Sequence, residues 1–562
     1  MSETSRSEIT SVIAQGSPAK EPVAVIYTKC RPPDDQGCLY PGFQPGVRVE
    51  NGIRIERDVA VKMRDGVTIY TDIYRPEGAT NVPAIVAWSP YGKQPLDRDR
   101  IGVPQGKGFG LTTVSPMAKF EGPDPAYWCQ QGYAVINPDA RGAFLSEGNI
   151  RYANSGEGQD AHDLIEWVAA RDWSSGKVGM SGNSWLAFSQ WFAAAERPPH
   201  LTAIAPWEGW SDFYRHLICP GGIPETGFAS FLMGFLCGSA EVEDVVAMIH
   251  KYPLLNEYWE DKIARLENIN IPAYITANFK HFHALGSLDA FRRMPTRDKW
   301  LRMINNFEWS DYYDLAAEED LRHFFDRYLK GIENDWELTP RVRLAVLDPG
   351  GLDLLNRPEK EWPLARTQYE KLYLDASSGT LSSQPVPRES PTRYAAETGH
   401  ASFVIRFDKE TELTGYLKLR LWVEADGADD MDLFVYVQKL DRKGAFLPSM
   451  TLGSPHPGAQ GWLRVSHREL DPVRSTPAEP YLTHRRQQFL HPQEIVPVEI
   501  GIWPTSMCWH PGQQLRVVVA GHFMRAPGWR EPFGYEVRNQ GDHVIQTGGK
   551  YDSHLLVPKI PV

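Results

Sequence analysis

Hydrophobic and polar residues begin to alternate regularly near residue 54. From Arg54 to Tyr74 the alternation runs on both sides of Asp65-Gly66, a pair that favours a two-residue type I′ turn. We therefore expect two antiparallel strands joined as a hairpin. Residues 1–50 mix Ser, Pro, Gly and charged residues without a period, which predicts an irregular arm that packs loosely or not at all.

Apolar strand-like runs then alternate with helical patterns. The runs at 83–89 and 133–139 predict buried strands, and the apolar face of 158–171 predicts an amphipathic helix. The segment 177–185, KVGMSGNSW, predicts a strand that ends in a sharp turn, and the residues after it predict a helix that stops before Pro198. Alternating strands and helices indicate an α/β fold, with helices on both faces of a parallel sheet.

The pattern of residues changes twice after residue 208. Residues 209–270 are rich in helix formers and aromatics and predict a helical cap inserted over the sheet. Strand-like runs return at 271–279 and 299–307, followed by a helix from Glu318 to Lys330. Short β segments separated by Gly, Pro and Asp then indicate a β-sandwich or jelly roll. The predicted domains are an arm (1–50), an α/β core (51–208 and 271–340), a cap (209–270) and a jelly-roll domain (341–562).

Composition narrows the function classes. At 562 residues the chain is too long for one hydrophobic core, and it contains no run of 18 or more apolar residues. The net charge of -12 disfavours nucleic acid and membrane headgroups as partners. The six cysteines are scattered without CxxC spacing, so we expect neither a zinc site nor a disulfide framework. The N-terminus shows no secretory signal, which predicts a cytoplasmic protein.

The turn Gly182-Asn183-Ser184-Trp185 is the strongest candidate for chemistry. A serine on a tight strand-to-helix turn is exposed above the sheet, and the backbone N–H after it points at a developing oxyanion. The second glycine of such an elbow would stand at Leu186, so the pattern is half met. By itself it is equally consistent with a serine that caps the following helix.

Ordered motifs along residues 55–562 strengthen the interpretation of Ser184 as a nucleophile. MRDGVTIYTDIYRP, WSPYGK, NPDARGAFLSEG, WSSGKVGMSGNSW, APWEGWSDFY, PVEIGIWPTSMCWHPGQQLRVVVAG and the final GDHVIQTGG resemble the CocE/NonD hydrolases, which include cocaine esterases, X-Pro dipeptidyl-peptidases and α-amino-acid ester hydrolases. The resemblance implies an α/β-hydrolase core with an inserted helical cap and a C-terminal jelly-roll (galactose-binding-like) domain. It also implies that Tyr91 donates its phenol to the oxyanion beside the Trp185 N–H.

The sequence departs from the family at the other two members of the triad. The family acid belongs in the turn that here reads 277–283, ANFKHFH, and the family histidine belongs in 303–309, MINNFEW. The first turn has no carboxylate and the second has no histidine. We therefore consider His283 or His281 as the base, with Glu308 or another carboxylate to orient it. The alternatives are loop histidines that are solvated or packed against the cap, and a Glu308 that is the buried ion-pair partner of a structural arginine.

The leading hypothesis is a serine acyl hydrolase that acts on a small, fairly hydrophobic ester or amide through an acyl-enzyme on Ser184. A non-hydrolytic reaction in a biosynthetic pathway (cyclisation, elimination or isomerisation) and a silent binding protein remain open. X-Pro dipeptidyl-peptidase activity ranks lower, because no acidic pocket for a peptide amino terminus is located. The substrate class depends on aromatics that could equally form the core of the cap: Trp207, Trp210, Phe213, Tyr214, Phe228, Phe231 and Phe235.

Other candidates receive no catalytic role. Asp139 and Asp160 match family blocks that tie loops together, and His216 is expected to be a satisfied surface histidine of the cap. HxH at 281–283 offers two imidazoles without a third ligand at metal-site spacing, and no nucleotide-binding motif is present. We therefore expect no metal and no cofactor. A small-molecule substrate is the expected partner, with homodimer formation left open.

Overall fold

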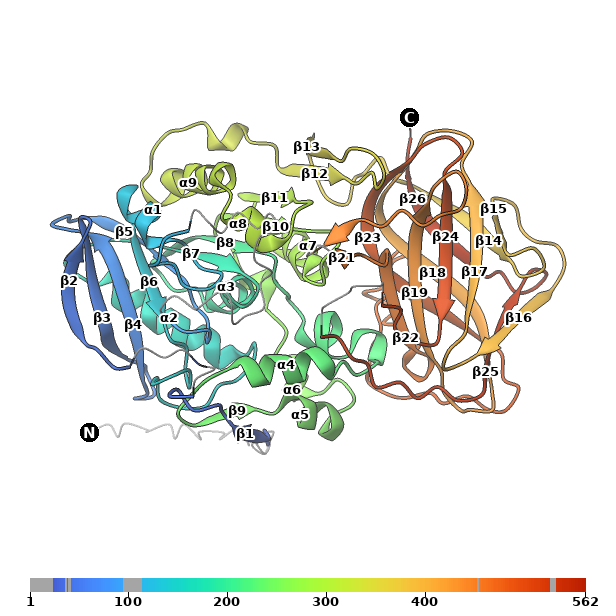
Figure 1. Cartoon of the computed structure of the whole chain (residues 1–562), viewed down its shortest axis with the longest axis horizontal. Coiled ribbons are helices and arrows are strands. Elements are labelled where there is room, and N and C mark those ends of the chain that lie inside the picture. The colour runs from blue at the N-terminus through green and yellow to red at the C-terminus, as the bar shows by residue number, and fades with distance from the viewer. Residues whose placement is uncertain are drawn as a thin grey trace, which may run out of the picture.

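The structure is a computed structural model that describes residues 24–35, 38, 42–93, 114–451, 454–525 and 532–561. Figure 1 shows an α/β body on the left, a body made almost entirely of strands on the right, and the green helices of the cap between them. The predicted arm lies partly outside the described residues.

The α/β body is built on an 11-stranded sheet. Its neighbouring strands from β6 through β12 run parallel, and the β2–β3–β4 meander and β13 are antiparallel at the two edges. The order across the sheet is β13 (Leu354–Glu359), β12 (Val342–Val346), β11 (Lys299–Met303), β10 (Ala273–Ala277), β8 (Leu201–Trp207), β7 (Ser174–Asn183), β5 (Val82–Val86), β6 (Ala134–Pro138), β4 (Thr68–Pro76), β3 (Ile53–Lys62) and β2 (Gly46–Glu50).

Helices cover both faces of this sheet, as the alternating pattern predicts. Successive residues of a strand point to opposite faces, so Val86 packs in the core under α2 and α3, and Ile85 packs in the core under α1 and α9. The helices of this body are α1 (Pro125–Gln130), α2 (Ser155–Ala169), α3 (Trp185–Ala195), α7 (Ala284–Arg293), α8 (Glu308–Tyr312) and α9 (Leu315–Leu329).

Two details of the sequence prediction are corrected in this body. The β3–β4 connection spans 63–67, and within it Gly66 alone has a positive φ, of 91°. A two-residue type I′ turn needs a positive φ at both central residues, so that prediction is wrong although the hairpin exists. The sheet also extends beyond both predicted limits, because β2 precedes residue 51 and β12 and β13 follow residue 340.

The cap between β8 and β10 is mostly helical. A short strand of the arm, β1 (Tyr27–Lys29), pairs with β9, and the disulfide Cys38–Cys237 joins the same two regions. The expectation that the cysteines form no disulfide is therefore wrong; residues 199 positions apart meet only in the folded chain. The cap elements are η2 (Tyr214–Ile218), η3 (Pro220–Gly222), α4 (Gly227–Phe235), β9 (Glu241–Glu243), α5 (Val245–Lys251), α6 (Glu257–Glu260) and η4 (Leu266–Asn268), with a 3₁₀ turn η5 (Trp336–Leu338) later in the core.

The C-terminal body is a second 11-stranded sheet, in which β26 pairs with both β14 and β18 so that the sheet closes on itself around an apolar core. Its strands are β14 (Gln368–Asp375), β15 (Thr380–Ser382), β16 (Ser390–Ala395), β17 (His400–Arg406), β18 (Thr411–Asp426), β19 (Asp432–Leu440), β22 (Ala459–Arg464), β23 (Val496–Trp509), β24 (Gln514–Ala520), β25 (Asp542–Thr547) and β26 (His554–Ile560), beside the small pair β20 (Met450–Thr451) and β21 (Ser454–Pro455) and the turn η6 (Val465–His467).

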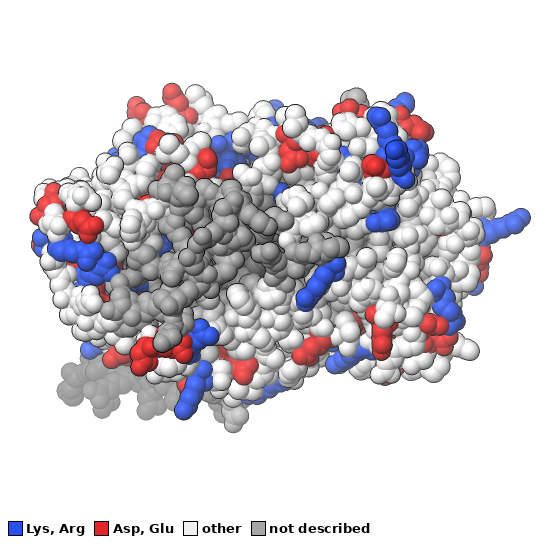
Figure 2. Space-filling model, in the orientation of Figure 1, with Lys and Arg blue, Asp and Glu red and all other residues white. Residues whose placement is uncertain are grey.

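The surface carries charges of both signs. On the face drawn in Figure 2, the described basic and acidic residues are interspersed among uncharged ones. Across the described ranges, no helix combines the length and the apolar character needed to cross a bilayer.

Candidate active site

Ser184 stands at the junction of β7 and α3 in a backbone conformation that side chains rarely adopt. Its φ is 54° and its ψ is -114°, a strain that costs about 1–3 kcal/mol and persists only where surrounding structure enforces it. The Ser184 N–H donates to the Glu208 carbonyl oxygen at 2.9 Å. Among the described residues the Ser184 side chain makes no capping hydrogen bond with α3, so the structure does not support the helix-cap alternative.

Gly182 makes this turn sterically feasible. A Cβ at Gly182 would lie 2.4 Å from the Cβ of Leu186 and 2.8 Å from the Glu121 carbonyl oxygen, and the φ of Gly182 is 143°. Leu186 therefore replaces the second elbow glycine by filling the space that the first glycine leaves open.

Tyr91 lies beside Ser184, as the family resemblance implies. The phenol is buried and within hydrogen-bonding reach of the Ser184 hydroxyl. Burial raises the pKa of Tyr91 well above 10, the Glu121 carboxyl raises it further, and the contact with Ser184 opposes the rise. The phenol therefore keeps its proton at neutral pH and is a hydrogen-bond donor.

Buried ion pairs of Lys93 hold the loop that carries Tyr91 in place. Lys93 places its buried Nζ 2.6 Å from Asp139 Oδ2 and 3.0 Å from Asp58 Oδ1. Asp139 thus ties the Tyr91 loop to the end of β6, which is the structural role expected for it. The Tyr91 ring itself packs edge-on against Phe120 and Trp185, with ring centroids 5.4 and 5.8 Å apart.

Both candidate histidines and Glu308 meet in one buried cluster, which also contains Glu208. His281 places Nδ1 2.9 Å from Glu208 Oε2 and Nε2 4.0 Å from Glu308 Oε1. His283 Nδ1 lies 3.3 Å from Glu308 Oε2. Burial lowers the pKa of His283 well below 6.5, and the neighbouring His281 lowers it further. The alternative of solvated loop histidines is therefore wrong, because both rings are at most 3% exposed.

The sheet explains why these residues converge. Glu208 follows β8, His281 follows β10 and Glu308 begins α8 after β11, so all three lie beyond the carboxyl ends of adjacent parallel strands. Side chains at this edge of an α/β sheet meet over its crevice. The sequence did not single out Glu208, although its position directly after the strand-like apolar run 201–207 was a signal that could have found it.

Glu121 is a second residue that the sequence did not reveal. Burial raises its pKa to about 8, and a hydrogen bond from the Trp309 indole to Oε1, at 2.9 Å, opposes that rise. Its backbone carbonyl accepts the Asn183 N–H at 3.2 Å. Glu121 and Glu208 both have a positive φ, of 60° and 61°, so two strained residues hold the backbone of the elbow. No pattern around residue 121 indicates this.

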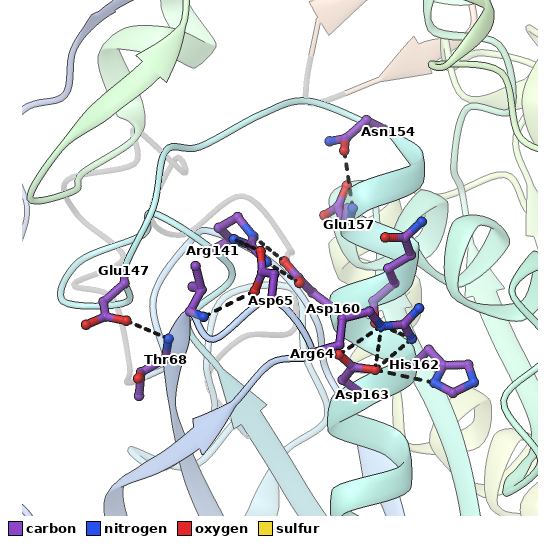
Figure 3. A network of polar contacts seen from close by, with 12 residues as sticks. Arg64, Asp65, Thr68, Arg141, Glu147, Asn154, Glu157, Asp160, His162 and Asp163 are labelled. Atoms are coloured by element: carbon purple, nitrogen blue, oxygen red, sulfur yellow. Dashed lines mark hydrogen bonds and ion pairs between the residues drawn. The ribbon is translucent and has the colours of Figure 1, made fainter. Parts of the chain in front are cut away.

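Glu157 supports the elbow from the other side. Its Oε1 accepts the indole N–H of Trp185 at 2.6 Å and that of Trp88 at 3.1 Å. Figure 3 shows Glu157 on α2 near the network in which Arg141 bridges Asp65 and Asp160. Asp160 therefore fastens α2 to the β3–β4 hairpin, in keeping with the expectation that it ties loops together.

The aromatic residues proposed for the substrate pocket divide into two groups. Trp207, Trp210, Phe213 and Tyr214 are at most 2% exposed and form core. The phenylalanines of α4 lie differently: Phe235 packs against Tyr91 with ring centroids 5.6 Å apart, and Phe231 is 50% exposed. His216 accepts the Asp212 N–H at 3.3 Å, within the cap.

Comparisons with known proteins agree with this geometry. Residues 65–235 match the X-Pro dipeptidyl-peptidase (S15) family, and residues 334–556 match the X-Pro dipeptidyl-peptidase C-terminal non-catalytic domain. The solved structure of a CocE/NonD family hydrolase from Staphylococcus aureus is 34% identical, covers 92% of this chain and 97% of its own, and superposes with a TM-score of 0.86. The chain belongs to the CocE/NonD hydrolase family.

Two further relatives are esterases by name. A cocaine esterase from a Rhodococcus species is 27% identical over 415 residues, which are 62% of this chain and 68% of that protein. A putative serine esterase from Mycobacterium tuberculosis is 21% identical over 620 residues, 88% of this chain and 94% of that one. The predicted family, the α/β-hydrolase core and the β-rich C-terminal domain are thus confirmed. The jelly-roll and galactose-binding-like assignment stays a prediction.

Proposed function

We propose that this CocE/NonD hydrolase is a serine acyl hydrolase in which Ser184 forms an acyl-enzyme. The Ser184 oxygen attacks an ester or amide carbonyl, and the Tyr91 phenol and Trp185 N–H stabilise the oxyanion. One observation carries the proposal. Ser184 has a strained backbone, its side chain does not cap α3, and it contacts the protonated Tyr91 phenol. Donors fixed in advance around a developing negative charge are usually the largest contribution to such catalysis.

The histidine pair is the proposed proton acceptor, with Glu308 as the carboxylate that orients it. The base would take the Ser184 proton as the C–O bond forms and return it to the departing alcohol or amine, after which water hydrolyses the acyl-enzyme. Support comes from the contacts of both imidazoles with Glu308. The imidazole then comes from the loop that carries the acid in the family, and the carboxylate from the loop that carries its histidine.

The proposed substrate is a small ester or amide with a fairly hydrophobic acyl or leaving group. Phe120 and Phe235 flank Tyr91, and the Trp309 ring packs against Phe120. An apolar surface beside the oxyanion donors favours an apolar substituent next to the scissile bond. X-Pro dipeptides rank below simple esters, because the buried Glu121 carboxyl near Tyr91 has a raised pKa and accepts a hydrogen bond from Trp309, which leaves it poorly suited to hold a charged peptide amino terminus.

Hydrolysis of nitrophenyl esters of increasing acyl length tests the proposal. We expect turnover in the unaltered protein and a loss of at least about 10³-fold in kcat for Ser184→Ala. Ser189→Ala is the matched control, since Ser189 lies on the same helix and bonds only backbone carbonyls among the described residues. Equal activity in Ser184→Ala would overturn the proposal. Absence of turnover and of any acyl-enzyme would favour the non-hydrolytic or binding alternatives.

A further inference from the structure

Glu208, His281, His283 and Glu308 form a buried cluster in which polar atoms of Glu208, His281 and His283 have no hydrogen-bond partner among the described residues. Each residue is at most 4% exposed. Within the described part of the chain, both carboxylate oxygens of Glu208 and Nε2 of His283 lack a hydrogen-bond partner. His281 Nδ1 is close to Glu208 but is not aligned for a hydrogen bond with it. Buried polar atoms without hydrogen-bond partners destabilise a fold, so these atoms call for an explanation.

The four side chains have the spacing of a metal site. One ligand atom from each lies within 4.8 Å of the ligand atoms of the other three. Ligand atoms of a tetrahedral zinc ion lie about 3.3 Å apart, given bonds of about 2.0–2.1 Å, so side-chain shifts of about 1 Å would close the site. The sequence offered only two of these ligands, at 281 and 283; the ends of β8 and β11 supply the other two.

Among the described residues, the adjacent buried cation does not satisfy this cluster. Lys280 is the adjacent buried cation, but its Nζ is held by the backbone carbonyls of Asn305 and Met450. Two carboxylates and two imidazoles offer lone pairs and favour a divalent cation. Imidazole ligands select zinc and similar transition ions over calcium or magnesium, which take oxygen ligands.

We propose that Glu208, His281, His283 and Glu308 bind one divalent transition-metal ion of the Zn²⁺ type, and that the bound ion inhibits acyl transfer. The inhibition rests on the proposed function: an imidazole whose lone pair is bound to a metal cannot accept the Ser184 proton. The binding itself does not depend on Ser184. The concentration of free metal ion would therefore regulate the hydrolase, because the bound ion coordinates the histidine that serves as the base.

Metal binding is measured first in the Ser184→Ala protein, where no catalysis interferes. After removal of metals with a chelator, calorimetric titration with Zn²⁺ should show one ion per chain. Adding Glu208→Gln or His283→Gln should weaken binding by about 100-fold or more, since even residues outside a first coordination shell contribute about 10–100-fold. A titration without stoichiometric binding, or with Glu208→Gln and His283→Gln unchanged, overturns the site.

A control and a spectrum guard against misfolded variants. His510 is also flanked by two carboxylates, at 2.9 Å from Asp348 and 3.8 Å from Glu410, but it is half-exposed and lacks a second imidazole. His510→Gln should leave Zn²⁺ affinity unchanged. X-ray absorption of the Zn²⁺-loaded, otherwise unaltered protein should show two imidazole ligands, and a spectrum of water oxygens or sulfur alone contradicts the site.

Ester hydrolysis separates this inference from the function on which it rests. Half-inhibition by Zn²⁺ should occur near the dissociation constant measured in Ser184→Ala. Tight binding with undiminished hydrolysis refutes the inhibition. Hydrolysis without any Zn²⁺ binding refutes the metal site and leaves the hydrolase standing. Zn²⁺ binding in a metal-free protein that never turns over esters retains the site and refutes the hydrolase.

Discussion

At the scale of single residues, Ser184, Glu121 and Glu208 share a positive φ, and the carbonyls of Glu208 and Glu121 accept the N–H groups of Ser184 and its neighbour Asn183. Such strain is stable only because the surrounding sheet and loops enforce it, and it concentrates at functional sites. The fold therefore holds the Ser184 oxygen in place before any substrate arrives. In the proposed mechanism, catalysis then depends on the hydrogen-bond donors that face this oxygen.

Tyr91→Phe removes one of those donors without changing the ring. We expect kcat for ester hydrolysis to fall about 10²- to 10³-fold with little change in KM, because the phenol acts on the oxyanion. Tyr152→Phe is the control, since its buried ring lies 5.2 Å from Trp185 and its hydroxyl has no hydrogen-bond partner among the described residues. Steady-state kinetics decide the matter, and an unchanged kcat in Tyr91→Phe removes Tyr91 from the oxyanion site.

Glu157 predicts a pH dependence of stability. Burial raises its pKa to about 7, although the Trp185 and Trp88 indoles oppose the rise. Between its usual pKa and pH 7 the folded chain binds more protons than the unfolded chain, so this residue makes the free energy of unfolding fall as pH rises. Above pH 7 the loss is complete.

Glu157→Gln should abolish that dependence. Relative to the unaltered protein, the free energy of unfolding of the variant should rise by up to about 3 kcal/mol from pH 5 to pH 8, at about 1.4 kcal/mol for each unit of pKa shift. Urea unfolding at several pH values measures it. Parallel pH profiles for the two proteins would show that Glu157 titrates normally.

Sequence reasoning located residues that carry a local signature and missed those that do not. Ser184 lies in a strand–turn–helix pattern that the sequence itself predicts, and Tyr91 lies in a motif that the family resemblance singles out. Glu208 reaches His281 only because β8 ends beside β10, which is a property of strand order. Glu121 contacts the elbow from a segment without periodicity, where its backbone has a positive φ. Contacts between distant segments of this kind are not encoded in any one window of the chain.

At the scale of elements, the β7–Ser184–α3 unit depends on Gly182. Gly182→Ala would place a methyl group 2.4 Å from Leu186 Cβ at a φ of 143°, so we expect the variant to lose about 2–4 kcal/mol of unfolding free energy and its esterase activity. Gly46→Ala is the control, since a Cβ there meets nothing within 4 Å. Denaturant melts measure both. Equal stability of the two variants would mean that the elbow relaxes easily.

Most strands and helices could be predicted from the periodicity of hydrophobic residues, because buried parallel strands and the helices that cover them differ in length and pattern. The β3–β4 turn was not predicted correctly, because the dipeptide Asp65-Gly66 is compatible both with a two-residue turn and with the longer loop that forms. The limits of the sheet were also misjudged. The edge strands β2 and β13 are largely exposed and lack the apolar runs that mark the centre.

At the scale of the whole molecule, separate regions hold the cap in place. The Cys38–Cys237 disulfide joins the cap to the N-terminal region. On the other side, Glu225 of the cap accepts a 2.8 Å hydrogen bond from the N–H of Gly534, which belongs to the C-terminal part of the chain. The cap therefore bridges both ends of the chain beside α4, whose Phe235 contacts Tyr91.

Loss of the disulfide should loosen the cap. Cys38→Ser/Cys237→Ser should lower the free energy of unfolding by about 2–5 kcal/mol in oxidising buffer, because the bond closes a long loop in the unfolded chain. In reducing buffer the double variant and the unaltered protein should unfold alike. A double variant as stable as the unaltered protein under oxidising conditions would show that the bond does not stabilise the fold.

Because disulfides are typical of oxidising compartments, the bond argues against the cytoplasmic prediction.

The central claim, that Ser184 is the nucleophile, is tested most directly by mapping where a fluorophosphonate probe attaches. Mass spectrometry of the digested protein should find one adduct, on the peptide that contains Ser184, and should find none in Ser184→Ala. An adduct on another residue while Ser184 stays unmodified, or no adduct in a folded protein, contradicts acyl transfer through this serine.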